Sequence, residues 1–236
     1  MGCIEVKNKS EEILIQEAEH VLNLKKQKSI QVDSVIRKFS LNGQVTSVQL
    51  NRISSHLKLQ TKNLFPFIKI DEFYGKLRDI NGNYDLKDLL VIGILLSDGE
   101  SSTKAGLLYQ IFDEELTGHM SLSKVKNQLL YKLVIHSCSS LPKLVSPRQA
   151  SNVNLEKIEK YSDCLIEKKD TCINSVAERL AVNGNDVTEI TFTEVFRTFR
   201  QGKLTSSVGW RAFLYEKYLC ENSKILVSTP AITESK

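Results

Sequence analysis

The sequence has few of the features that mark membrane-spanning, secreted or zinc-binding chains. Its 236 residues contain no apolar run long enough to cross a bilayer, and the N-terminus is charged from Glu5 onward, where a signal peptide needs an apolar stretch. No C-x-x-C pair or histidine at zinc-ligand spacing accompanies the scattered cysteines Cys3, Cys138, Cys164, Cys172 and Cys220. These absences favour a reducing, cytoplasmic setting.

An excess of one charge and catalytic patterns are also missing. The net charge is only +4, so the chain lacks the basic footprint of a nucleic-acid binder, and we expect no nucleic-acid partner. The histidines are separated by whole helices and have no evident acid or nucleophile partners: His20, His56, His119 and His136. The glycines stand alone in turns and form no phosphate-binding loop. We therefore expect a protein that is not an enzyme.

Apolar residues recur at helical spacing along almost the whole chain, which predicts an all-α fold. Ser10 predicts a capped helix start, and the apolar stripe through residues 125–134 predicts a helix that ends near His136. The serines and prolines of residues 137–147 predict a loop. A charged helix through Leu155, Ile158 and Leu165 is expected to follow it.

Four joints between these helices share one pattern: a polar turn, a lone apolar residue, and a new helix carrying an apolar residue five positions later. The lone apolar residues are Val45, Tyr84, Met120 and Ile190. Such spacing suggests an internal repeat. We expect the loops to pair two by two, each pair forming a minimal antiparallel ribbon through its lone apolar residues.

The repeat predicts a two-lobed chain. The expected parts are an N-terminal anchor and helix at 1–29, a first pair at 30–97, a second pair at 101–202 with an insert at 137–169, and a C-terminal helix and tail at 203–236.

The joints resemble the EF-hand, and the two pairs resemble the calmodulin, calcineurin B and neuronal calcium sensor superfamily. The most specific match is the third loop, which has Gly118 at the sharp turn. The resemblance implies weak metal-ligand positions at Asp113, Glu115, Thr117 and His119 in the third loop and at Asn183, Asn185, Glu189 and Glu194 in the fourth.

The same comparison shows why these loops are poor calcium sites. Calcium requires six to eight oxygen ligands and a closing bidentate glutamate. The third loop ends in Lys124, and the first two loops are short and end in Gln49 and Asp88. The fourth is predicted to end in Glu194 and to turn at Thr188, where glycine is expected. We therefore expect no cofactor, apart from calcium at low affinity.

The start Met-Gly-Cys predicts a lipid anchor. Removal of Met1 would expose Gly2 for myristate and leave Cys3 for palmitate, which is the two-chain anchoring that stable membrane binding needs. Val6 departs from the myristoylation pattern, which has serine or threonine there. This anchor would place the chain on the inner face of a membrane.

The expected function is an EF-hand-like adaptor that binds an amphipathic partner helix in an apolar groove. The helix capped by Ser206 or Ser207 would fill the groove as an internal plug through Trp210, Phe213 and Leu214, although the same residues fit ordinary core packing. Two alternatives remain: a calcium sensor that uses loop 3 or loop 4, and a structural component of a cytoskeletal or ciliary assembly.

Overall fold

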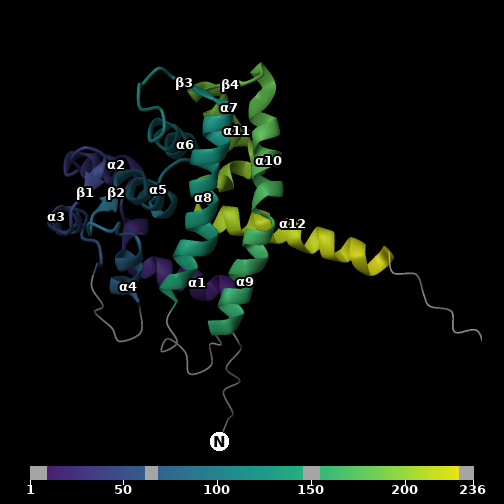
Figure 1. Cartoon of the computed structure of the whole chain (residues 1–236), viewed down its shortest axis with the longest axis horizontal. Helices are drawn as coiled ribbons and strands as arrows, with labels where there is room; N and C mark the ends of the chain where they lie inside the picture. Colours follow the sequence, from purple (N-terminus) through teal and green to yellow (C-terminus); the bar gives the residue numbers. More distant parts are fainter. Residues whose placement is uncertain (1–9, 62–68, 146–154, 229–236) are drawn as a thin grey trace, which may run out of the picture.

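The computed structural model describes residues 10–61, 69–145 and 155–228, with the side chains of 183 and 221–228 left aside. It is mostly helical, as the periodicity predicts (Figure 1). The helices of the first half are α1 (Glu11–Val21), η1 (Leu24–Lys26), α2 (Ser29–Lys38), α3 (Ser47–Leu57), α4 (Ile70–Lys76) and α5 (Leu86–Leu96). The second half has α6 (Ser101–Gln110), α7 (Leu122–Lys124), η2 (Val125–Leu130), α8 (Tyr131–Ile135), η3 (His136–Ser140), η4 (Leu141–Leu144), α9 (Leu155–Glu167), α10 (Lys169–Leu180), η6 (Ala181–Asn183), α11 (Glu189–Thr198), η7 (Phe199–Thr205) and α12 (Ser207–Ser228).

The strands of the described residues form two short antiparallel ribbons. In the first, β1 (Gln44–Val45) pairs with β2 (Tyr84–Asp85), and Val45 lies opposite Tyr84 as predicted. In the second, β3 (His119–Ser121) pairs with β4 (Asp186–Thr188), and Met120 lies opposite Val187. The prediction that Ile190 fills this position is wrong, because Ile190 is 82% exposed in the first turn of α11.

The fourth loop turns at a different residue from the one predicted. Gly184 has φ +78° and makes the turn, a conformation that glycine adopts without steric cost. Thr188 has φ −83° and caps α11, with its side chain accepting a hydrogen bond from the Thr191 amide. The prediction that the loop turns at Thr188 is therefore wrong.

Helix α5 lies at the centre of the molecule. Every residue from Leu89 to Leu96 is buried, as expected for a helix with apolar residues on all sides. It packs on α2 so closely that a Cβ at Gly93 would lie 2.7 Å from Val32 Cγ1. Because α5 also contacts α6, α8 and η3, one continuous apolar core joins the two halves.

The insert is more helical than predicted. The helix that starts at Leu122 continues through η2, α8 and η3 to Ser140, and η4 follows it directly, so the predicted loop over the first part of the insert is wrong. Pro142 does not interrupt η4, because it lies in the first turn, where a proline removes no helical hydrogen bond. The predicted charged helix is α9.

The chain reverses direction between α11 and α12. Arg200, Gln201 and Gly202 have φ of 53°, 57° and 74°, and a Cβ at Gly202 would lie 2.6 Å from Ser101 Cβ. The reversal returns α12 to the body, where its first turns contact η3, α8, α9 and α10. Its C-terminal part extends beyond the body (Figure 1).

Arg211 ties α12 to the N-terminal helix. Its side chain is fully buried, and its five N–H donors make five hydrogen bonds: two to Glu12 at 2.8 and 2.9 Å, two to Glu19 at 2.7 and 3.3 Å, and one to the Ser137 carbonyl at 3.0 Å. Burial lowers the pKa of Arg211, but the charges and hydrogen bonds of Glu19 and Glu12 outweigh that effect and raise it. Tyr161 of α9 also donates to Glu12 at 3.1 Å.

We predict that Arg211→Met destabilises the fold by about 3–5 kcal/mol, because it leaves the buried Glu19 carboxylate without its partner. Chemical denaturation monitored by circular dichroism measures this change. The control is Arg37→Met, which removes an exposed pair with Asp33 and should cost less than about 1 kcal/mol. Equal losses of unfolding free energy in the two variants would contradict the special role of Arg211.

Candidate functional site

The four helices that leave the loops all begin in the same way. Each has an N-cap side chain that accepts a hydrogen bond from the amide three residues later, as is typical of helix starts. The cap and closing residues are Thr46 with Gln49, Asp85 with Asp88, Ser121 with Lys124, and Thr188 with Thr191. The cap thus identifies Thr191, three residues before the predicted Glu194, as the closing residue of the fourth loop. None of the four is a glutamate.

The first acidic residue of the third loop, Asp113, already has partners within the protein. Asp113 accepts hydrogen bonds from the Thr117 amide and hydroxyl at 3.2 Å and from the Gly118 amide at 2.7 Å. Across the ribbon, His119 Nδ1 lies 2.8 Å from an Asp186 carboxylate oxygen. Glu115 is exposed. The loop therefore keeps its shape by hydrogen bonds among its own residues.

The predicted ligands of the fourth loop do not converge on one point. Glu194 forms a bidentate pair with Arg197 at 2.7 and 2.9 Å on the surface of α11. Glu189 accepts from Gln110 at 2.8 Å, and the Asn185 carbonyl accepts from the Leu122 amide at 2.8 Å. The Asn183 side chain lies outside the description. Over the described ranges, no cluster of three or more histidine, cysteine or acidic side chains could hold a metal ion.

The closing residue of the second loop joins the two halves. Asp88 accepts from Lys132 and lies 2.8 Å from His136 Nε2, while His136 Nδ1 lies 3.3 Å from the Ser140 hydroxyl. Burial raises the pKa of Asp88, but hydrogen bonds and charge from His136 and Lys132 bring it below its ordinary value. His136 therefore has an acidic partner 48 residues away, contrary to the sequence expectation.

The predicted plug residues all lie in the core. Trp210, Phe213 and Leu214 are at most 2% exposed, and the Trp210 ring packs near Phe196 with centroids 6.4 Å apart. The α12 segment that carries them lies against the helices of the second half. Because Arg211 lies in the same turn and is bound to α1, this segment is an integral part of the fold.

Two of the cavities lined by described residues have similar volumes. The first has a volume of about 290 Å³ and lies between α4, η4 and α9. Its apolar lining includes Pro142 and Ile158, flanked by Lys76 and Lys143 on one side and Glu159 on the other. Those two lysines form no ion pair with any described residue, so the cavity has free charges at its margins.

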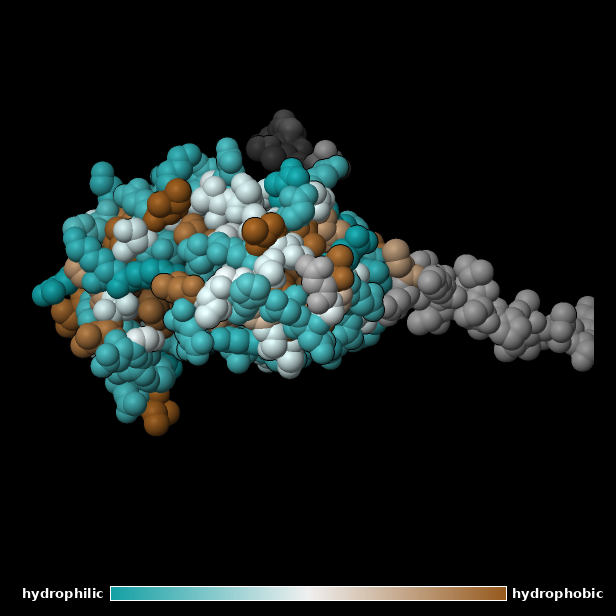
Figure 2. Space-filling model, turned by 90° about the horizontal axis from the view of Figure 1, so that it is seen from above, coloured by the Kyte–Doolittle hydropathy of each residue, from teal (hydrophilic) through white to brown (hydrophobic). Residues whose placement is uncertain are grey.

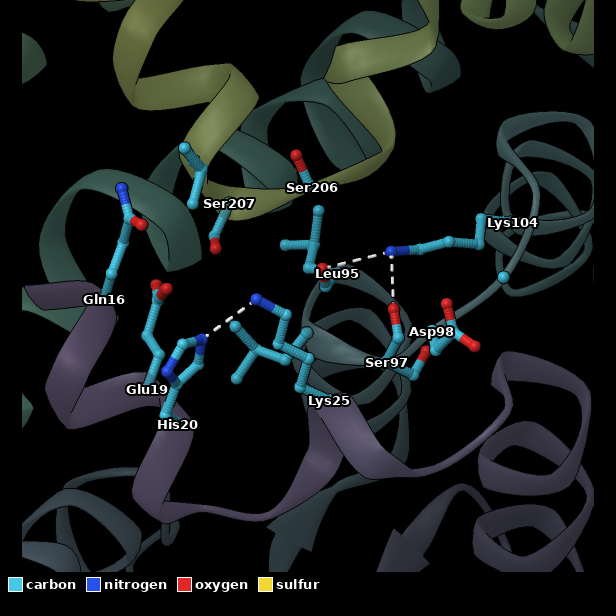
Figure 3. A pocket seen from close by; sticks show the side chains of 13 residues that line it. Gln16, Glu19, His20, Lys25, Leu95, Ser97, Asp98, Lys104, Ser206 and Ser207 are labelled. Atoms are coloured by element: carbon cyan, nitrogen blue, oxygen red, sulfur yellow. Dashed lines mark hydrogen bonds between the residues drawn. The ribbon is translucent and has the colours of Figure 1, made fainter.

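The second cavity has a volume of about 300 Å³ and lies where α1, the α5–α6 connection and the start of α12 meet (Figure 3). Its lining includes His20, Lys25, Lys104 and Ser207. Lys104 is only 4% exposed, and burial lowers its pKa to about 8. Sequence patterns gave no sign of this lysine, because its burial depends on three segments that are distant along the chain.

No known family, curated protein or solved structure matches the chain. No helix among the described residues is long and apolar enough to cross a membrane. The predicted lipidation residues Gly2 and Cys3 lie outside the described residues.

We predict that chelator and millimolar calcium give the same melting temperature and the same Trp210 fluorescence, because Asp113 and Glu194 already have partners and a ligand stabilises only above its dissociation constant. Lys124→Glu, which adds the missing closing carboxylate, should raise the melting temperature in millimolar calcium. Glu194→Gln should change neither quantity. Stabilisation of the unaltered protein by micromolar calcium would contradict this interpretation.

Proposed function

We propose that the chain is a non-enzymatic, EF-hand-like adaptor that works without calcium. The observation that carries this proposal is the closure of the loops: their polar groups bond to one another, and each exiting helix is capped by its own side chain. In a calcium sensor, metal binding drives the conformational change. Here the paired loops are held in one conformation by the protein itself.

The proposed partner is an amphipathic helix, and its proposed binding site is the groove between α4, η4 and α9. The groove of the second half is filled by α12, whose removal would break the buried Arg211 pairs at a cost of about 3–5 kcal/mol. The groove between α4, η4 and α9 offers Pro142 and Ile158 to the apolar face of a helix.

Charge at the groove margins defines the partner further. Lys76 and Lys143 lie on the α4 and η4 side, and Glu159 and Asp163 lie on α9. A helix with acidic residues on one flank and basic residues on the other complements both margins. Apolar side chains elsewhere are dispersed, as the brown residues on the face in Figure 2 show, and they offer no comparable concave surface there.

We predict that Lys76→Glu with Lys143→Glu abolishes capture of a helical partner from native cell extract, because it reverses one margin of the groove. The control is Lys26→Glu with Lys38→Glu, which changes net charge equally on exposed residues away from the groove. Pull-downs in chelator and in calcium should give the same result. Capture that needs calcium would favour a sensor, and equal capture by both charge variants would exclude this groove.

We also propose that lipids on Gly2 and Cys3 anchor the adaptor to a membrane surface, as the Met-Gly-Cys start indicates. Gly2→Ala should move the protein to the soluble fraction, and Cys3→Ser should weaken membrane retention, because one acyl chain binds only marginally. Fractionation with intact-protein mass spectrometry measures both effects. Detection of unmodified Met1 on the native protein would refute the anchor.

A further inference from the structure

Lys104 lines the 300 Å³ cavity with its buried side chain. It extends from α6 to the end of α5, where its Nζ donates to the Leu95 carbonyl at 3.1 Å and to the Ser97 carbonyl at 3.0 Å. No carboxylate of the described residues lies within 4.0 Å of this nitrogen. A buried lysine without an acidic partner is unusual, because burial penalises its charged form.

The two carbonyls account for both N–H donors of a neutral amine. A neutral lysine amine has two N–H bonds and one lone pair, so the lone pair has no partner among the described residues and the cavity adjoins it (Figure 3). Desolvation lowers the pKa of Lys104 to about 8, so a substantial fraction of the amine is neutral near neutral pH. These are the conditions under which a lysine becomes a nucleophile.

The rest of the cavity suits an anion. Lys25 forms no ion pair with a described residue, and its Nζ lies 3.0 Å from His20 Nε2. Of the acids nearby, Asp98 is paired with Lys28, and Glu19 shares the Arg211 charge with Glu12.

The start of α12 adds to this preference. Helix N-termini attract anions, and α12 is 22 residues long. Its first residue, Ser207, is 1% exposed, and its hydroxyl points into the cavity without a hydrogen bond to any described residue (Figure 3). This hydroxyl is therefore available to a polar ligand in the cavity.

We propose that this cavity binds a small aldehyde carrying an anionic group, and that Lys104 forms an imine with it. The lysine lone pair attacks the carbonyl carbon, the π electrons move to oxygen, and a proton passes from nitrogen to that oxygen. The nitrogen lone pair then forms the C=N bond as the hydroxyl leaves, and the second proton of the amine passes to that hydroxyl, which departs as water. The reaction releases one water, needs no oxidant or reductant, and does not depend on the proposed adaptor function.

The test treats the full-length protein with pyridoxal 5′-phosphate, reduces the imine with borohydride, and maps the adduct by mass spectrometry. At pH 7.5 Lys104 should be labelled on the order of tenfold or more faster than the exposed Lys26 and Lys38, because far more of its amine is neutral. The rate of Lys104 labelling should level off above pH about 8. The other titratable groups that line the cavity are His20, Lys25, Glu19 and Asp98. Labelling of Lys104 no faster than that of Lys26 would overturn the proposal.

Two variants test imine formation by Lys104 separately from binding of the anionic group. Lys104→Arg can still donate to both α5 carbonyls but cannot form an imine, so the rapidly formed adduct should disappear. Ser207→Ala should slow labelling by pyridoxal 5′-phosphate and leave labelling by uncharged pyridoxal unchanged. If Lys104→Arg does not fold, the relative labelling of lysines in the unaltered protein still decides. Equal rates for the two aldehydes would refute the anionic part of the proposal.

Discussion

The buried charge of Arg211 constrains most of the second half. A guanidinium removed from water needs nearby anions and a full set of acceptors, or it costs several kcal/mol. Glu12, Glu19 and the Ser137 carbonyl supply them from α1 and η3, elements that are distant from α12 in sequence. The pairing therefore fixes three helices at once. It also keeps the aromatic turn around Trp210 in the core.

The pairing of Arg211 with Glu12 and Glu19 affects both cavities. It holds α12 against the helices of the second half and leaves the surface between α4, η4 and α9 as the proposed partner site. By placing the first turn of α12 beside α1, it brings Ser207 to the same cavity as Lys25 and Lys104. Thus one ionic network, built from residues that look ordinary in sequence, positions both proposed sites.

The loops are closed by hydrogen bonds within the protein. In each of them, hydrogen bonds from caps and turn amides provide the order that an ion provides in a calcium site. Asp88 is the clearest case, since the carboxylate at the closing position pairs instead with His136 and Lys132 of the other half. The loop geometry is thereby coupled to the contact between the two halves.

Local signals made the helices and the Val45 to Tyr84 pairing predictable, because periodicity, turns and caps depend on neighbouring residues. The predicted alignment of the fourth loop with the EF-hand pattern is wrong because it starts at Asn183. The cap at Thr188 and the turn at Gly184 set the actual register of the loop. Partners of buried charges were not predictable. Glu19 and Arg211 are 192 residues apart, and nothing in either neighbourhood indicates the other.

Hydrogen exchange of the Trp210 to Leu214 amides, measured in chelator and in calcium, tests the central claim most directly: α12 is held permanently by Arg211 without metal. The account predicts that these amides exchange only through global unfolding, with the same protection in both conditions. Exchange through local release of α12, or a change in its protection on adding calcium, would contradict it.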